Sequence, residues 1–140
     1  GDVDQVNVTF LLTLLNSDIV PVLAPLTHDG QGQMLNTNAD TIASETATAL
    51  AKRDITTQLV FGFELNGVLE NFEDKTSVIN QITSESYKTL KAKGIISQGM
   101  IPKLDNAFSA VSAGVQSVTI CHALQVGKAV KGDAGTMIKS

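Results

Sequence analysis

Three polar segments of the sequence contain residue types that could position and neutralise a phosphate group. The first is Asn36-Thr-Asn-Ala-Asp40, in which two carboxamides and a carboxylate alternate at the expected start of a helix. Asn and Asp are favoured at helix N-termini, so capping is the common role for such residues. One cap needs only one polar residue, so capping does not account for all three side chains. The remaining side chains would suit the binding of a polar ligand.

The second segment, Gly94-Ile-Ile-Ser-Gln-Gly-Met-Ile-Pro-Lys103, places Lys103 in the first turn of a helix that Pro102 opens. A cation there opposes the helix dipole, at a cost of roughly 0.3–1 kcal/mol when it is exposed. Lys103 is therefore either a solvated surface lysine or a charge that converges with helix N–H groups on a bound phosphate. The third segment, residues 64–69, contains Asn66-Gly67, which is usually a turn but also lets the backbone approach a nucleotide.

Composition argues against several other kinds of site. The chain has 10 Lys plus Arg against 14 Asp plus Glu, a net charge of −4, and lacks the basic stripe of a general nucleic-acid binder. Cys121, the single cysteine, forms no metal-ligand pattern with His28 and His122, so we expect no protein metal site. No apolar run approaches the ~20 residues of a membrane helix. We therefore expect a cytoplasmic protein with no nucleic-acid or membrane partner.

The elements that must position these residues alternate between helices and strands. Apolar periodicity predicts helices over 6–15, with Asp4 as a cap, and over 40–52, 84–93, 102–113 and 123–130. β-Branched runs predict strands over 19–24, 33–36, 57–63, 117–120 and 136–138. This alternation predicts an α/β fold with a mainly parallel sheet, in which ligands collect at the carboxyl ends of the strands.

The order and spacing of the three segments resemble those of the corresponding segments in the acetylglutamate kinases, a branch of the amino acid kinase family. The resemblance covers residues 1–137. GQMLNTNAD at 32–40 is similar to the family pattern G-x-x-x-N-x-N-A-D, and IISQGMIPK at 95–103 is similar to the end of G-x-I-x-x-G-M-x-x-K. Residues 63–68 correspond to the family's T/S-D-x-x-G-V/I. The resemblance implies a three-layer αβα sandwich, with the end of the amino-acid-substrate domain at 1–55 and the ATP-binding domain at 56–140.

The resemblance also implies roles for individual residues. Asn36 is expected to bind the acylated substrate, Asp40 to hold catalytic lysines in place, and Lys103 to stabilise charge on the transferring phosphoryl group. The residues expected to line the ATP site are Glu64, Leu65, Asn66, Gly67, Val68, Leu69, Ile95, Ile96 and Ser97.

The reaction implied by the resemblance is transfer of the γ-phosphoryl of ATP to the γ-carboxylate of N-acetyl-L-glutamate, or a related N-acyl-glutamate, in arginine biosynthesis. ATP is the co-substrate, Mg²⁺ is bound through its phosphates, and the parent enzyme is expected to be a homo-oligomer such as a dimer. No Walker-type P-loop is present, so the phosphates must be held in another way.

Two departures from the family pattern lead to further expectations. Phe63-Glu64 stands where the family has Thr or Ser followed by Asp, so the polar contacts of the nucleotide pocket are expected to differ. The Lys-Gly-Gly segment, a second glycine pair and a substrate-binding arginine of the family's N-terminal half are not in this sequence. We therefore expect a fragment, a separately built domain or a partial sequence of a longer protein, which is inactive alone.

Three alternative interpretations remain open. The first is another amino acid kinase, which acts on aspartate, glutamate or a carbamate-type acceptor. The second is a non-catalytic nucleotide-binding or regulatory domain. The third is a structural or dimerising module, which would have no affinity for nucleotides.

Overall fold

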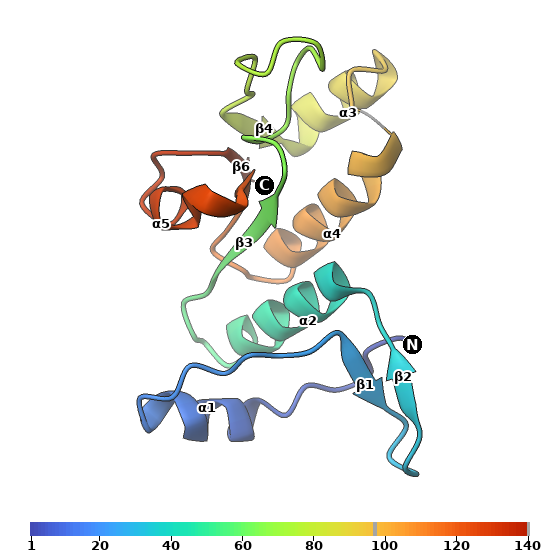
Figure 1. Ribbon diagram of the computed structural model, residues 1–140, viewed down its shortest axis with the longest axis vertical. Coiled ribbons are helices and arrows are strands. Elements are labelled where there is room, and N and C mark those ends of the chain that lie inside the picture. The colour runs from blue at the N-terminus through green and yellow to red at the C-terminus, as the bar shows by residue number, and fades with distance from the viewer. Residues whose placement is uncertain (97, 140) are drawn as a thin grey trace.

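The computed structural model describes residues 1–96 and 98–139, and its centre is a four-stranded sheet (Figure 1). The strand order is β3-β5-β6-β4, where β3 pairs parallel with β5, β6 pairs parallel with β4, and β5 and β6 are antiparallel. The mainly parallel sheet predicted from the sequence is confirmed. The strands are β3 (Gln58–Phe63), β4 (Gln81–Thr83), β5 (Ser117–His122) and β6 (Thr136–Lys139).

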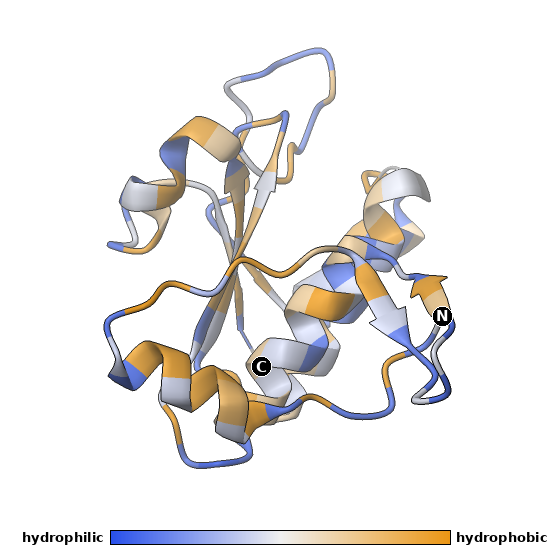
Figure 2. Ribbon diagram, turned by 60° about the horizontal axis from the view of Figure 1, so that its bottom comes forward, coloured by the Kyte–Doolittle hydropathy of each residue, from blue (hydrophilic) through white to orange (hydrophobic). Residues whose placement is uncertain are grey.

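Helices cover both faces of this sheet. Figure 2 views the sheet nearly edge-on, with α2 (Ala39–Ala51) and α4 (Ile101–Ser112) on one side. The 3₁₀ turn η2 (Ala123–Gln125) and α5 (Val126–Ala129) lie on the other side. This arrangement confirms the three-layer αβα sandwich. The remaining helical elements are α1 (Val8–Asn16), α3 (Ser84–Ala92) and the 3₁₀ turn η1 (Gln98–Met100).

The core lies between the sheet and the pair α2 and α4. Leu104 on α4 is fully buried against the sheet, and Ala107 and Ala110 on the same helical face let α4 approach the strands closely. Each large aliphatic side chain removed from water contributes roughly 1.5–3 kcal/mol. The fully buried side chains of the strands are Ile82, Val118, Ile120 and Ile138.

Polar caps and glycines set the helix ends. Thr83 and Ser86 form a reciprocal capping box at the start of α3. Gly94 and Gly114 have φ values of +69° and +102° after α3 and α4, and both helices end where the sequence predicts. The expected cap of α1 is wrong: Asn7, and not Asp4, accepts the hydrogen bond from the N–H of Phe10 at 3.0 Å.

The strand predicted over 19–24 is wrong. This segment is irregular, and Val20 and Val22 are 81% and 93% exposed (the apolar coil between α1 and β1 in Figure 2). A β-branched run becomes a strand only when another strand satisfies its backbone groups, and within the described residues none pairs with 19–24. Pro21 has no N–H to offer such a partner.

The short strands β1 (Leu26–His28) and β4 were not predicted from the sequence, whereas the strand predicted over 33–36 is confirmed as β2 (Met34–Asn36). β1 pairs antiparallel with β2, and residues 29–33 form the tip of this hairpin. Asp29 orders this tip, because its Oδ1 accepts hydrogen bonds from the N–H groups of Gln31 and Gln33 at 2.7 and 3.1 Å. These contacts hold the pKa of the Asp29 carboxyl below its usual value. β4 also lies in a region without a clear pattern.

A buried hydrogen bond ties the loop after β3 to the last strand. The N–H of Val68 donates to Oγ1 of Thr136 at 2.8 Å, and Thr136 is fully buried. Gly67 lies so close to this contact that a Cβ there would be 2.7 Å from Thr136 Oγ1 and 2.9 Å from Val78 Cγ1. The glycine is therefore required by packing.

No helix in the described part of the chain is both long and apolar enough to cross a membrane.

We predict that Thr136→Val lowers the free energy of unfolding by about 1–3 kcal/mol, because it leaves the buried N–H of Val68 without an acceptor. The measurement is chemical denaturation followed by circular dichroism. Thr89→Val makes the same atomic change at an exposed position of α3 and should alter stability by less than about 0.5 kcal/mol. Equal effects of the two substitutions would show that the buried contact adds nothing.

Candidate active site at the start of helices α2 and α4

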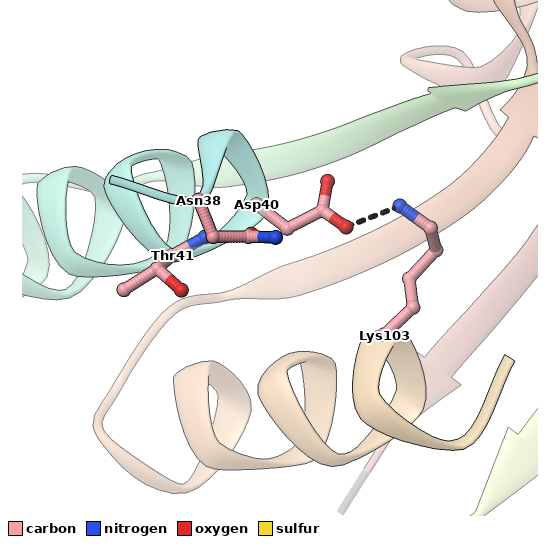
Figure 3. A network of polar contacts seen from close by, with 4 residues as sticks. All are labelled: Asn38, Asp40, Thr41 and Lys103. Atoms are coloured by element: carbon pink, nitrogen blue, oxygen red, sulfur yellow. Dashed lines mark hydrogen bonds and ion pairs between the residues drawn. The ribbon is translucent and has the colours of Figure 1, made fainter. Parts of the chain in front are cut away.

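Helix α2 begins directly after the hairpin because Asn38 caps it. The Asn38 backbone is extended, and its Oδ1 accepts a hydrogen bond from the N–H of Thr41 at 3.1 Å (Figure 3). Thr37 is buried beside it and shares a hydrogen bond of 2.8 Å with the hydroxyl of Thr27 on β1. These contacts place Asp40 in the first turn of α2, where the helix dipole favours a carboxylate.

Lys103 lies in the first turn of α4 and points at the start of α2. Its Nζ donates a hydrogen bond to Oδ2 of Asp40 at 2.6 Å across 63 residues of sequence (Figure 3). The side chain of Lys103 is 13% exposed and that of Asp40 is 34% exposed, so the ion pair is partly buried. The structure thus brings together the two residues that the sequence predicted to be catalytic.

The geometry concentrates positive potential at one point. Helices α2 and α4 lie side by side and run in the same direction, so their N-termini are at the same end (Figures 1 and 3). Each N-terminus carries a partial positive charge of roughly half an elementary charge. Lys103 adds a full charge, and Asp40 offsets the cost of placing an ammonium at the start of α4. This arrangement is suited to an anionic ligand.

Two aromatic rings of β3 lie beside the ammonium. Lys103 Nζ is 4.8 Å from the ring centroid of Phe61 and 5.8 Å from that of Phe63. Both distances are within the range of cation–π attraction. Sequence reasoning singled out Phe63 only as a departure from a family pattern and did not single out Phe61 at all. The signal that could have found them is their alternation on β3, which directs both rings to the face covered by α4.

The other predicted site residues have diverse environments. Asn36 ends β2 with an exposed side chain, Glu64 and Asn66 are exposed just after β3, and Leu65 is half-buried. β3 and β5 are parallel and end in register at Phe63 and His122, so the loop that contains Glu64 leaves from the carboxyl edge of the sheet.

Several predicted ATP-site residues are buried. Ile95 is half-buried, and Ser97 lies outside the described residues. A buried residue can contribute to a nucleotide pocket through its backbone N–H and C=O groups, or by supporting the loop that lines the pocket. The buried residues are Gly67, Val68, Leu69 and Ile96.

No group of three or more His, Cys, Asp or Glu side chains suited to a metal ion occurs among residues 1–96 and 98–139. His122 instead accepts a hydrogen bond at Nδ1 from the N–H of Leu124 at 3.2 Å and thereby caps η2. Cys121 is buried, and this burial raises the pKa of its thiol.

Comparison with known proteins decides the family. The sequence profile of the amino acid kinase family matches residues 1–122. The chain belongs to the amino acid kinase family. Two curated relatives are the acetylglutamate kinases of Cytophaga hutchinsonii, 58% identical over 88% of this chain, and Phocaeicola vulgatus, 56% identical over 99% of it.

A solved structure also resembles this amino acid kinase chain. The crystal structure of smu.665 from Streptococcus mutans UA159 superposes with a TM-score of 0.79 and 34% identity over 99% of the chain and 50% of that protein. The match covers 46% of the Cytophaga protein and 52% of the Phocaeicola protein. The chain therefore spans about half the length of the curated relatives that it matches.

We predict that Asn38→Ala lowers the free energy of unfolding by about 0.5–2 kcal/mol, because the N–H of Thr41 loses its acceptor at the start of α2. Thermal or chemical denaturation measures the change. Asn38→Ser should retain most of the stability, since a serine hydroxyl also caps a helix. If alanine and serine behave alike, the Asn38 side chain does not act as a cap.

Proposed function

We propose that the natural protein containing this chain transfers the γ-phosphoryl group of ATP to the γ-carboxylate of N-acetyl-L-glutamate, or of a related N-acyl-glutamate, in arginine biosynthesis. The observation that carries the proposal is the Lys103 ammonium held by Asp40 where two helix N-termini converge. The similarity to acetylglutamate kinases over most of this chain supports the choice of acceptor.

Phosphoryl transfer suits such a site because the reaction depends on positioning and charge neutralisation. The acceptor carboxylate is itself the nucleophile, so the protein supplies no attacking side chain. Lys103 Nζ stabilises the negative charge that builds on the oxygens of the transferring group. Asp40 keeps the ammonium in place before the nucleotide arrives, which removes a reorganisation cost from the reaction.

Mg²⁺ fits this scheme through the nucleotide. The Oδ2 atom of Asp40 is engaged by Lys103, and Mg²⁺ is commonly held by phosphate oxygens and water with only one or two carboxylates. The phosphates of ATP would therefore be its main ligands, and the ion would neutralise part of their charge.

The remaining residues divide between two ligands in this proposal. Residues 1–55 are the end of the amino-acid-substrate domain, where the exposed carboxamide of Asn36 binds the acylated substrate. Residues 56–140 form the ATP-binding domain, where the loop at 64–69 and the segment around Ile95 and Ile96 line the nucleotide site. The natural protein is proposed to be a homo-oligomer.

We expect Lys103→Ala in the natural protein to lower kcat about 100-fold or more, because one donor to the transferring phosphoryl group is lost. Acyl phosphate formed from ATP and N-acetyl-L-glutamate is trapped with hydroxylamine and quantified as the hydroxamate. Lys88→Ala, at an exposed position of α3, is the matched control and should change kcat less than twofold. A near-normal kcat in Lys103→Ala would remove this residue from the site.

The acceptor is tested with the unmodified protein. Turnover with aspartate, glutamate or carbamate, and none with an N-acyl-glutamate, would assign the protein to another branch of the family. Binding of ATP or ADP without any turnover, measured by calorimetric titration, would favour a non-catalytic nucleotide-binding role.

The 140-residue chain alone is expected to show no turnover of ATP with N-acetyl-L-glutamate, because it corresponds to about half of each curated relative. The same hydroxamate assay applies to the purified chain, with the natural protein as the positive control. Measurable hydroxamate above the no-enzyme blank would contradict this expectation.

A further inference from the structure

We propose that Phe63, together with Phe61, is a positioning residue that holds the Lys103 ammonium by cation–π attraction and leaves its remaining N–H donors free for phosphoryl oxygens. The proposal rests on the proposed function, because it assigns a role to the surroundings of the same lysine.

The rings are placed by the geometry of the strand. Phe61 and Phe63 are two residues apart on β3, so both side chains point to the same face of the sheet. That face is covered by α2 and α4, and Lys103 enters it from the first turn of α4. Phe61 is 3% exposed and belongs to the core, whereas Phe63 is partly buried and packs against that core at the last position of β3.

Aromatic rings around the Lys103 ammonium are useful because they stabilise its charge without occupying its N–H donors. A lysine ammonium has three N–H donors, and among the described residues Asp40 accepts the single hydrogen bond that Lys103 makes. The Lys103 side chain is 13% exposed, so its charge lies in a partly buried place where further stabilisation is useful.

A second carboxylate could stabilise this charge, but it would occupy another donor and cancel the positive potential of the site. The face of a phenylalanine ring attracts a cation without acting as a strong hydrogen-bond acceptor. Two rings at 4.8 and 5.8 Å therefore fix the position of Nζ while its other donors stay available. A phosphoryl oxygen is the kind of ligand that would use them.

The kinetic test compares Phe63→Leu with Phe63→Tyr in the natural protein. The leucine variant keeps an apolar side chain without the ring face, so kcat should fall about tenfold while KM for ATP and for the acceptor changes less than twofold. The tyrosine variant keeps the ring face and should restore kcat to within about threefold of the unmodified protein. A leucine variant with unchanged kcat, or a tyrosine variant as slow as the leucine variant, would overturn the proposal.

Phe72→Leu is the matched control. Phe72 is 62% exposed, and its ring lies 3.8 Å from Nζ of Lys75, a cation–π contact outside the candidate site. The same atomic change there should leave kcat within twofold of normal. If it lowers kcat as much as Phe63→Leu does, the loss at Phe63 is not specific to Lys103, and the proposal fails.

A second readout does not depend on activity. In the natural protein labelled with ¹³C at lysine Cε, ring currents should shift the Lys103 ε-protons upfield, with the resonance assigned from its disappearance in Lys103→Arg. The shift should move toward the lysine average in Phe63→Leu and persist in Phe63→Tyr. A Lys103 resonance that does not respond to loss of the ring would overturn the proposal whatever the kinetics show.

The two readouts separate this proposal from the proposed function. A ring-dependent shift in a protein without kinase activity would support the positioning of Lys103 and sink the proposed reaction. Full activity with no ring-dependent shift would do the opposite. Should Phe63→Leu fail to fold, Phe63→Met fills the same space with a flexible, non-aromatic side chain and repeats both measurements.

Discussion

The ion pair between Asp40 and Lys103 is the contact on which the organisation of the candidate site depends. It joins the first turns of α2 and α4, which would otherwise place two partial positive charges and an ammonium close together with no ion pair to another described residue. Asp40 compensates this charge in the free protein, and its second oxygen is not needed for the contact. The two helix N-termini keep the site attractive to an anion, while the ammonium is already paired with a carboxylate. An anion can therefore bind without rearrangement of the charged groups.

The strand connection, the packing of α4 and the cap of α2 together position Asp40 and Lys103. The parallel pairing of β3 with β5 requires a crossover connection, and α4 belongs to that connection and packs on the same face as α2. The small side chains Ala107 and Ala110 let α4 lie close to the sheet, which brings Lys103 within reach of both Asp40 and the rings of β3. The Asn38 cap sets where α2 begins and therefore where the carboxylate stands.

The α/β class and most element positions were predictable because their signals are local. Apolar periodicity, the prolines and glycines at helix ends, and the β-branched runs of β3 and β5 each depend on a few neighbouring residues. The segment at 19–24 shows the limit of such signals. Its residues are typical of a buried strand, yet it has no strand partner among the described residues, and Val22 is 93% exposed. β4 is the opposite case, since it is defined by pairing with β6 and has little pattern of its own.

The sequence by itself determined which residues could carry chemistry: a carboxylate in the first turn of one helix and a lysine in the first turn of another. Only the tertiary structure decided that these groups meet at 2.6 Å, that Asn38 is a cap, and that Gly67 is required by packing against Thr136. It also decided that two phenylalanine rings surround the ammonium. The physical reason is that helix starts and turns are encoded by adjacent residues, whereas contacts across 63 residues depend on how the sheet and its helices pack together.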